Sequence, residues 1–139
     1  MNAPTYTTAI LRLAASLEAP HKLEREDGRT ELRSPTCGST IMTAISVDPE
    51  GRVQQISQDV RACAFGQASA ALLAANAAGR TRAEVAEALD ELTAWLAGKR
   101  DYCGSWPGLD ALAPARPKTA RHGAILLPFR GLLAAMDKA

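Results

Sequence analysis

The spacing of apolar residues changes twice along the chain, and this change limits the possible folds more than any other feature. Over residues 5–17, apolar side chains recur every three or four positions, which is typical of one face of an α-helix. Over residues 29–60 they alternate with polar side chains, which predicts β-strands separated by turns. The helical spacing then returns and predicts helices at about 66–79, 81–97 and 125–138. Together these elements predict a single α+β domain in which helices pack on a three-stranded antiparallel sheet.

Local signals predict how the later helices begin and where they are interrupted. Thr81 and Glu84 have the spacing of a capping box, so a helix is expected to begin there. Proline in a helix interior clashes with the carbonyl group four residues earlier. The last helix is therefore expected to begin near Ile125, with Pro128 in its first turn. The segment 99–118 is rich in glycine and proline, and we expect a loop with about one helical turn.

The charge and hydropathy of the sequence argue against several classes of partner. Sixteen basic residues against fifteen acidic ones give a net charge of +1, so no excess positive field attracts nucleic acid or an anionic membrane. The apolar runs are much shorter than the roughly 20 residues of a membrane-spanning helix, and the first residues lack the pattern of a secretion signal. We therefore expect a cytoplasmic protein, a monomer or weak homo-oligomer, with no nucleic-acid or membrane partner.

Three cysteines offer the most reactive side chains of the sequence. Their odd number argues against a disulfide framework and favours free thiols, metal ligands or a nucleophile. Cys37 lies between two predicted strands, with Pro35 before it and Gly38 after it. Proline restricts the entry to this loop and glycine permits a tight turn, so the thiol is expected at the loop tip. The alternative is a small apolar side chain that fills a turn.

The other two cysteines have different sequence surroundings. Cys63 directly precedes a predicted helix, where free backbone N–H groups and the helix dipole favour a thiolate, and Arg61 acts in the same direction. The alternative is a buried cysteine at a strand-to-helix corner. Cys103 lies in the long loop and is expected to be an incidental thiol, with Asp101 close enough to contribute a carboxylate. Trp106 is expected to pin this loop to the core.

The segments around two of the cysteines resemble the motifs of a known family. Pro35-Thr36-Cys37-Gly38, followed by Ala62-Cys63-Ala64 and Gln67-Ala68-Ser69-Ala70, is similar to the motifs NPxCGD and GCAISxASAS. These motifs belong to the NifU-like scaffold proteins of iron–sulfur cluster assembly, IscU and SufU. The first helix and residues 121–132 are also similar to the start of the family and to its last motif, RxxCAxLxW. The resemblance implies the SufE/NifU-like scaffold fold, on which three cysteines and an Asp or His hold a [2Fe–2S] cluster or zinc.

The sequence departs from this family at two ligand positions. Ser39 lies where the family has aspartate, and a neutral hydroxyl is a weaker ligand for zinc or iron than a carboxylate. Ala124 lies at the position of the third cysteine, and its methyl group cannot bind a metal. His122, two residues earlier, offers an imidazole that binds zinc or iron well. The resemblance thus predicts Cys37, Cys63 and His122 as metal ligands; the alternative for His122 is an exposed or helix-capping side chain.

These features support three hypotheses about function. In the first, the chain is a non-enzymatic scaffold whose Cys37 and Cys63 accept sulfur or bind a transient [2Fe–2S] cluster or zinc. Its partners would be a cysteine desulfurase and iron–sulfur acceptor proteins, as the resemblance implies. In the second, the chain is a metal-free persulfide acceptor or a desulfurase activator. In the third, it is a binding module that has lost the metal site. The first two both use thiolates, which are nucleophiles and soft metal ligands.

Overall fold

The computed structural model describes residues 6–35 and 37–139. Its elements are, in chain order, α1 (Thr8–Ala15), β1 (Gly28–Arg33), β2 (Thr40–Val47), β3 (Val53–Arg61), α2 (Ala64–Asn76), α3 (Arg82–Leu96), the 3₁₀ helices η1 (Leu109–Ala115) and η2 (Thr119–Arg121), and α4 (His122–Asp137). The strands form one antiparallel sheet in the order β1-β2-β3. The predicted α+β class with a three-stranded antiparallel sheet is confirmed. No helix in this described part of the chain is long and apolar enough to cross a membrane.

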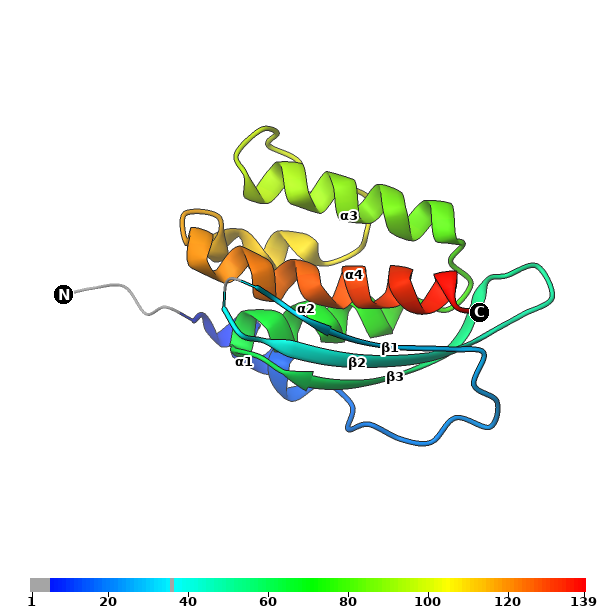
Figure 1. The fold of residues 1–139 in the computed structure, drawn as a ribbon. Coiled ribbons are helices and arrows are strands. Elements are labelled where there is room, and N and C mark those ends of the chain that lie inside the picture. The colour runs from blue at the N-terminus through cyan, green and yellow to red at the C-terminus, as the bar shows by residue number, and fades with distance from the viewer. Residues whose placement is uncertain (1–5, 36) are drawn as a thin grey trace.

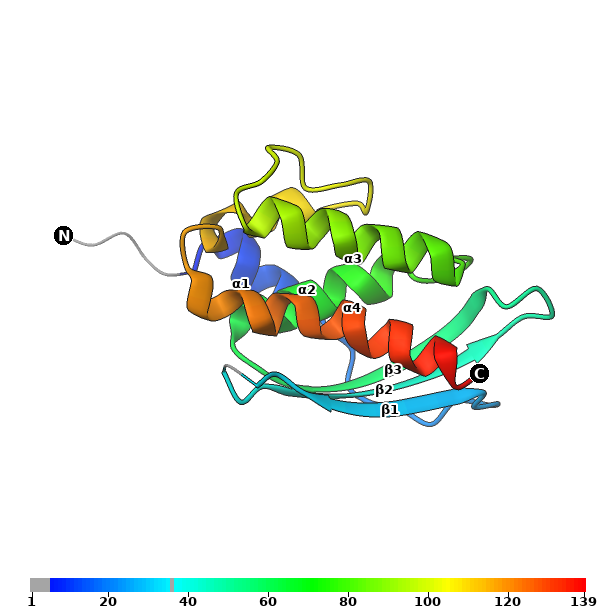
Figure 2. The ribbon, with the colours of Figure 1, turned by 45° about the horizontal axis from the view of Figure 1, so that its top comes forward.

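The sheet and the helices form layers (Figures 1 and 2). Helices α2 and α4 pack on one face of the sheet, and α1 packs beside α2. Helix α3 packs on α4 from the side away from the sheet. The segment from α1 to β1 runs along the other face of the sheet, where Leu23 is buried. The main core therefore lies between the sheet and the helices.

Strand β2 lies at the centre of the sheet, and its alternate side chains face the helices. Ile41, Thr43 and Ile45 are all almost fully buried. Helix α4 crosses this strand so closely that a Cβ atom on Gly131 would lie 2.7 Å from Oγ1 of Thr43 and 3.2 Å from Cγ2 of Ile41. Glycine at this position therefore allows the helix to pack directly on the strand.

Hydrogen bonds at the helix starts explain where the boundaries agree with the prediction and where they differ. Helix α1 covers 8–15 instead of 5–17 because Oγ1 of Thr7 accepts a hydrogen bond from the backbone N–H of Ile10; residue 5 lies outside the described residues. Helix α2 begins two residues earlier than predicted, directly after Cys63. The predicted capping box of α3 is confirmed, because Thr81 and Glu84 each accept a hydrogen bond from the backbone of the other.

The prediction that the last helix begins near Ile125 is wrong. Helix α4 begins at His122, and Pro128 lies in its interior. The helix η2 leads directly into α4, and Oγ of Ser69 on α2 donates a hydrogen bond to the carbonyl of Ile125 at 2.6 Å. A proline removes one helical hydrogen bond. The contact from Ser69 holds the start of α4 against α2, and the sequence pattern does not contain it.

The long loop after α3 is attached to the core by Trp106, as the sequence predicts. Its side chain is buried, and Nε1 donates a hydrogen bond to the carbonyl of Leu72 at 3.0 Å. Its ring stands edge-on to Phe129, with ring centroids 5.3 Å apart. Leu109 and Leu112 of η1 are also buried, so the segment that follows is anchored as well.

Candidate functional site

The predicted cysteine segments meet at one end of the sheet. In the antiparallel register, Thr40 of β2 pairs with Arg61 of β3. Cys37 lies three residues before this pair and Cys63 two residues after it, so both segments leave the sheet at the same end. The starts of α1, α2 and α4 lie at this end too (Figures 1 and 2). We call this region the cysteine end.

The loop of Cys37 is closed by its own backbone. The N–H of Ser34 donates to the carbonyl of Ser39 at 2.8 Å, and the N–H of Gly38 donates to the carbonyl of Ser34 at 3.1 Å. Gly38 has a φ of 74°, which favours glycine at this turn. Cys37 is exposed, and its Sγ is hydrogen-bonded to Oγ of Ser39 at 3.1 Å. A closed loop thus presents the thiol to solvent, as the sequence predicts.

The surroundings of Cys37 favour its thiolate. Partial burial alone would raise the pKa of this thiol. Hydrogen bonds from the side chains of Ser34 and Ser39, the backbone of Ser39 and the positive charge of Arg121 act in the opposite direction, and together they lower the pKa below its ordinary value. Because the thiolate is the reactive form, these surroundings favour nucleophilic attack by Cys37.

Cys63 is held at the start of α2. It is the N-cap residue of that helix and is half-buried. The backbone N–H of Gln67 donates to the carbonyl of Cys63 at 3.0 Å, and Nε2 of Gln67 donates to the carbonyl of Ala62 at 3.0 Å. The main chain around this thiol is therefore fixed by one glutamine that lies a turn further along the helix.

Tyr6 is a further residue of the site. Its hydroxyl is hydrogen-bonded to the Cys63 side chain, and its ring stands edge-on to Phe65 with centroids 5.0 Å apart. Burial and then the negative charge of a Cys63 thiolate raise the pKa of Tyr6, against the charge of Arg121, which lowers it. The sequence pattern assigns Tyr6 only to the apolar face of the first helix. The contact between its hydroxyl and Cys63 joins residues that are distant in sequence, so the spacing of apolar residues could not predict it.

Arg121 connects the two halves of the cysteine end. It lies where η2 passes into α4, and its side chain is half-buried. Its positive charge lowers the pKa of Cys37 in one loop and acts on Tyr6, the partner of Cys63, in the other. Charge interactions weaken with distance, so Arg121 lies near enough to Cys37 and to Tyr6 to act on both. The sequence motif gave Arg121 only as a matching position.

The imidazole of His122 faces backbone carbonyls. Its Nε2 lies 2.9 Å from the carbonyl oxygen of Ala115 and 3.0 Å from that of Arg116. When Nε2 donates its N–H to these carbonyls, the lone pair lies on Nδ1, which is then the only ring nitrogen that could bind a metal. This geometry ties the start of α4 to the end of η1, in agreement with the helix-end alternative for His122.

The residues present do not fit a metal centre with four protein ligands. Within 6–35 and 37–139, no group of three or more His, Cys, Asp or Glu side chains is arranged to hold a metal ion. Ala124, at the family's third cysteine position, is 2% exposed and packs against α2 next to Gly66. Metal binding by Cys37, Cys63 and His122 thus remains a prediction without geometrical support.

Cys103 lies outside the cysteine end and in different surroundings. It is buried with the core cluster, and its Sγ lies 3.8 Å from the carbonyl oxygen of Gly104. Burial, and then the negative charge of Asp110, raise the pKa of this thiol. Cys103 is therefore a poor nucleophile at neutral pH, in contrast to Cys37.

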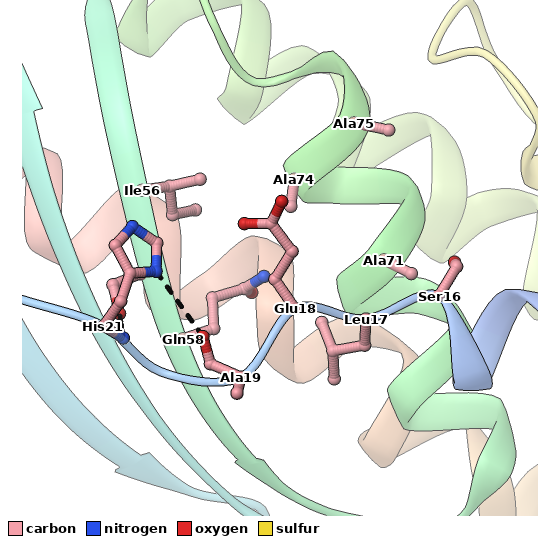
Figure 3. A pocket seen from close by; sticks show the side chains of 11 residues that line it. Ser16, Leu17, Glu18, Ala19, His21, Ile56, Gln58, Ala71, Ala74 and Ala75 are labelled. Carbon is pink, nitrogen blue, oxygen red and sulfur yellow. Dashed lines mark hydrogen bonds between the residues drawn. The ribbon is translucent and has the colours of Figure 1, made fainter.

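A pocket of about 320 Å³ lies between the end of α1, strand β3 and helix α2 (Figure 3). Its walls are mainly small or apolar side chains of α2 and β3, and the side chains of Glu18 and His21 also line it. Neither Cys37 nor Cys63 lines this pocket. It is separate from the cysteine end.

Two solved structures are similar to this chain over nearly its whole length. The N-terminal part of a nitrogen-fixing NifU-like protein from Brucella abortus has a TM-score of 0.83 and 28% sequence identity, and the match covers 95% of this chain and 92% of that chain. A protein from Fervidobacterium islandicum AW-1, described as an iron–sulfur cluster assembly scaffold for the SUF system, has a TM-score of 0.81 and 19% identity, with 95% of this chain and 96% of that chain covered. No family model matches the chain, and no curated protein sequence does.

The chain shares with these structures a fold in which helices cover one face of a three-stranded antiparallel sheet, and its own two thiol segments lie at one end of that sheet. The chain is thus similar in fold and sequence to a NifU-like protein, and it has Ser39 and Ala124 at the positions where the NifU-like motifs have aspartate and the third cysteine.

Proposed function

We propose that the chain acts in iron–sulfur cluster assembly as a scaffold-like, non-enzymatic protein that accepts sulfur on Cys37. The observation that carries this proposal is the exposed Cys37 thiol, with its pKa lowered, on a loop closed by backbone hydrogen bonds. A role in cluster assembly is supported by the fold, which the chain shares with a NifU-like protein and with a protein named as a cluster assembly scaffold. A cytoplasmic setting, which keeps thiols reduced, suits the role.

Cys37 accepts sulfur by thiol–persulfide exchange. The sulfur donor is a persulfide on a cysteine desulfurase, the partner that the family resemblance implies. The Cys37 thiolate attacks the terminal sulfur of that persulfide, a new S–S bond forms on Cys37, and the donor's S–S bond breaks. The donor cysteine leaves as a thiolate, so electrons balance without an oxidant or reductant. Ser39 and Arg121 assist because they stabilise the attacking anion.

Mass spectrometry tests this proposal directly. The chain is incubated without oxygen with a cysteine desulfurase and cysteine, and the mass of the intact protein is measured. We expect a gain of at least one sulfur atom, which should fall in Cys37→Ala to the smaller amount that Cys63 accepts, and should be retained in Cys103→Ala, whose substituted thiol is buried. A gain that persists at full extent in Cys37→Ala would contradict the assignment of Cys37 as acceptor.

Cys63 is proposed as the second sulfur-accepting thiol. It lies at the same end of the sheet but is half-buried and hydrogen-bonded to Tyr6. Less exposure means slower encounter with a protein-bound persulfide. In the same experiment, Cys63→Ala should retain the first sulfur on Cys37 and lose any second one.

A further inference from the structure

The two thiols of the cysteine end have hydroxyl groups as partners. Cys37 is hydrogen-bonded to Oγ of Ser39 at 3.1 Å, and Cys63 is hydrogen-bonded to the hydroxyl of Tyr6. A hydroxyl can donate to a thiolate or accept from a thiol, so it satisfies the sulfur in either state. Both sulfur atoms are thus accommodated by side chains of this protein.

The other described residues near these thiols do not complete a metal site. A structural zinc site needs four ligands in tetrahedral geometry. Ala124 fills the position of a third thiolate with a buried methyl group, and His122, whose Nε2 faces two carbonyls, retains only Nδ1 as a possible ligand. In the part of the chain that the structure describes, no three potential ligands converge. Two thiols with hydroxyl partners leave too few ligands for firm binding.

We infer that this protein handles sulfur at a metal-free pair of hydroxyl-bonded thiols, Cys37 and Cys63, and holds neither zinc nor a cluster with its own side chains alone. The inference rests on the proposed function and deepens it, because it defines the form in which sulfur is held. Sulfur received on Cys37 stays as a persulfide and is passed on when a thiolate of the next protein attacks its terminal sulfur. That exchange again forms one S–S bond, breaks one and releases the Cys37 thiolate.

Zinc binding tests this inference without any sulfur donor. The reduced chain is loaded with zinc in the absence of oxygen and dialysed, and zinc per chain is measured. We expect far less than one zinc ion per chain, with the same value in Cys37→Ser and Cys63→Ser. Reconstitution with iron and sulfide should likewise leave no cluster absorption in the visible spectrum.

A variant in which the two missing ligands are restored serves as the positive control for zinc binding. The double substitution Ser39→Asp and Ala124→Cys adds a carboxylate beside Cys37 and a thiol beside the start of α2, and should bind about one zinc ion per chain. The matched control, Ser39→Asn with Ala124→Ser, has similar volume at both positions but neither the carboxylate nor the thiol. It should bind no more zinc than the unaltered chain.

Stoichiometric zinc on the unaltered chain, lost in Cys37→Ser and in Cys63→Ser, would overturn the inference. If the double variant fails to fold, as circular dichroism would show, the measurements on the unaltered chain still decide it. These results are independent of the persulfide experiment. A chain that takes up sulfur on Cys37 and also binds zinc firmly would refute the inference and leave the proposed function intact.

Discussion

Cys37 and Cys103 are the same residue type in opposite surroundings. Cys37 is exposed and receives hydrogen bonds and a nearby positive charge, whereas Cys103 is buried beside the negative charge of Asp110. The pKa of the first thiol is lowered and that of the second is raised. The reactivity of each thiol therefore depends on its burial and on a few polar or charged neighbours, because these determine its pKa.

The rate of alkylation should report this difference as a function of pH. Measured in Cys63→Ser/Cys103→Ala, the rate for Cys37 should rise with pH around a midpoint below that of an ordinary thiol, because its pKa is lowered. Ser39→Ala should move the midpoint to higher pH, because a hydrogen bond to the thiolate is removed. Ser105→Ala, an exposed serine outside this loop, is the control and should leave the midpoint unchanged. An unmoved midpoint in Ser39→Ala would refute this role of the hydroxyl.

Helix α2 combines two tasks at the scale of a single element. Its first turn holds Cys63, and the same turn makes the closest approach to α4. A Cβ atom on Gly66 would lie 2.7 Å from Cβ of Ala62, 3.1 Å from the carbonyl oxygen of Ala124 and 3.2 Å from Cβ of Ala124. The separation of the two helices at the cysteine end therefore depends on the missing side chain.

Gly66→Ala should consequently destabilise the protein. Alanine in place of glycine normally stabilises a helix by about 0.5–1 kcal/mol. Here the added methyl group would force α2 and α4 apart, and overpacking costs typically about 1–3 kcal/mol. Urea unfolding followed by circular dichroism measures the net change. If Gly66→Ala unfolded at a higher urea concentration than the unaltered chain, α2 and α4 would be able to move apart without loss of stability.

The start of α3 gives a second prediction at this scale. Thr81→Ala removes the side-chain oxygen that accepts from the N–H of Glu84, and N-cap losses of this kind cost about 1 kcal/mol. Thr81→Ser keeps the oxygen and should cost much less. Equal losses in the two variants, measured by urea unfolding, would mean that packing of the threonine methyl group matters more than the cap.

At the scale of the whole molecule, contacts between distant segments hold the layers together. Trp106 lies in the long loop, yet its indole bonds the backbone of α2 and its ring packs on Phe129 of α4. The loop leads through η1 and η2 to Arg121 at the cysteine end. Attachment of this loop therefore also determines where the cation of the site lies.

Trp106→Phe should loosen this attachment. The variant retains an aromatic ring but loses the Nε1 hydrogen bond to Leu72 and part of the buried surface, a loss of about 1–3 kcal/mol. Limited proteolysis should then cut residues 99–105 faster than in the unaltered chain. Unchanged cleavage and unchanged stability together would show that η1 alone anchors the loop.

Much of the fold could be predicted because it depends on local patterns. Alternation over residues 29–60 corresponds to strands β1 to β3, and the spacing of Thr81 and Glu84 to a real capping box. The start of α4 was predicted wrongly, because Pro128 locally disfavours a longer helix, whereas η2 leads directly into α4 at His122 and α4 packs on α2 through Ser69. In the site, the segments of Cys37 and Cys63 were recognisable from motifs.

The sequence by itself determined the α+β class, the order of the elements, the turn that exposes Cys37 and the lack of a third cysteine at Ala124. These features depend on residue type and on spacing along the chain. Only the tertiary structure decided that Tyr6 lies beside Cys63, that the charge of Arg121 acts on Cys37 and Tyr6, and that Nε2 of His122 faces two carbonyls. The physical reason is that these contacts join segments far apart in sequence, and packing of the helices on the sheet fixes their geometry.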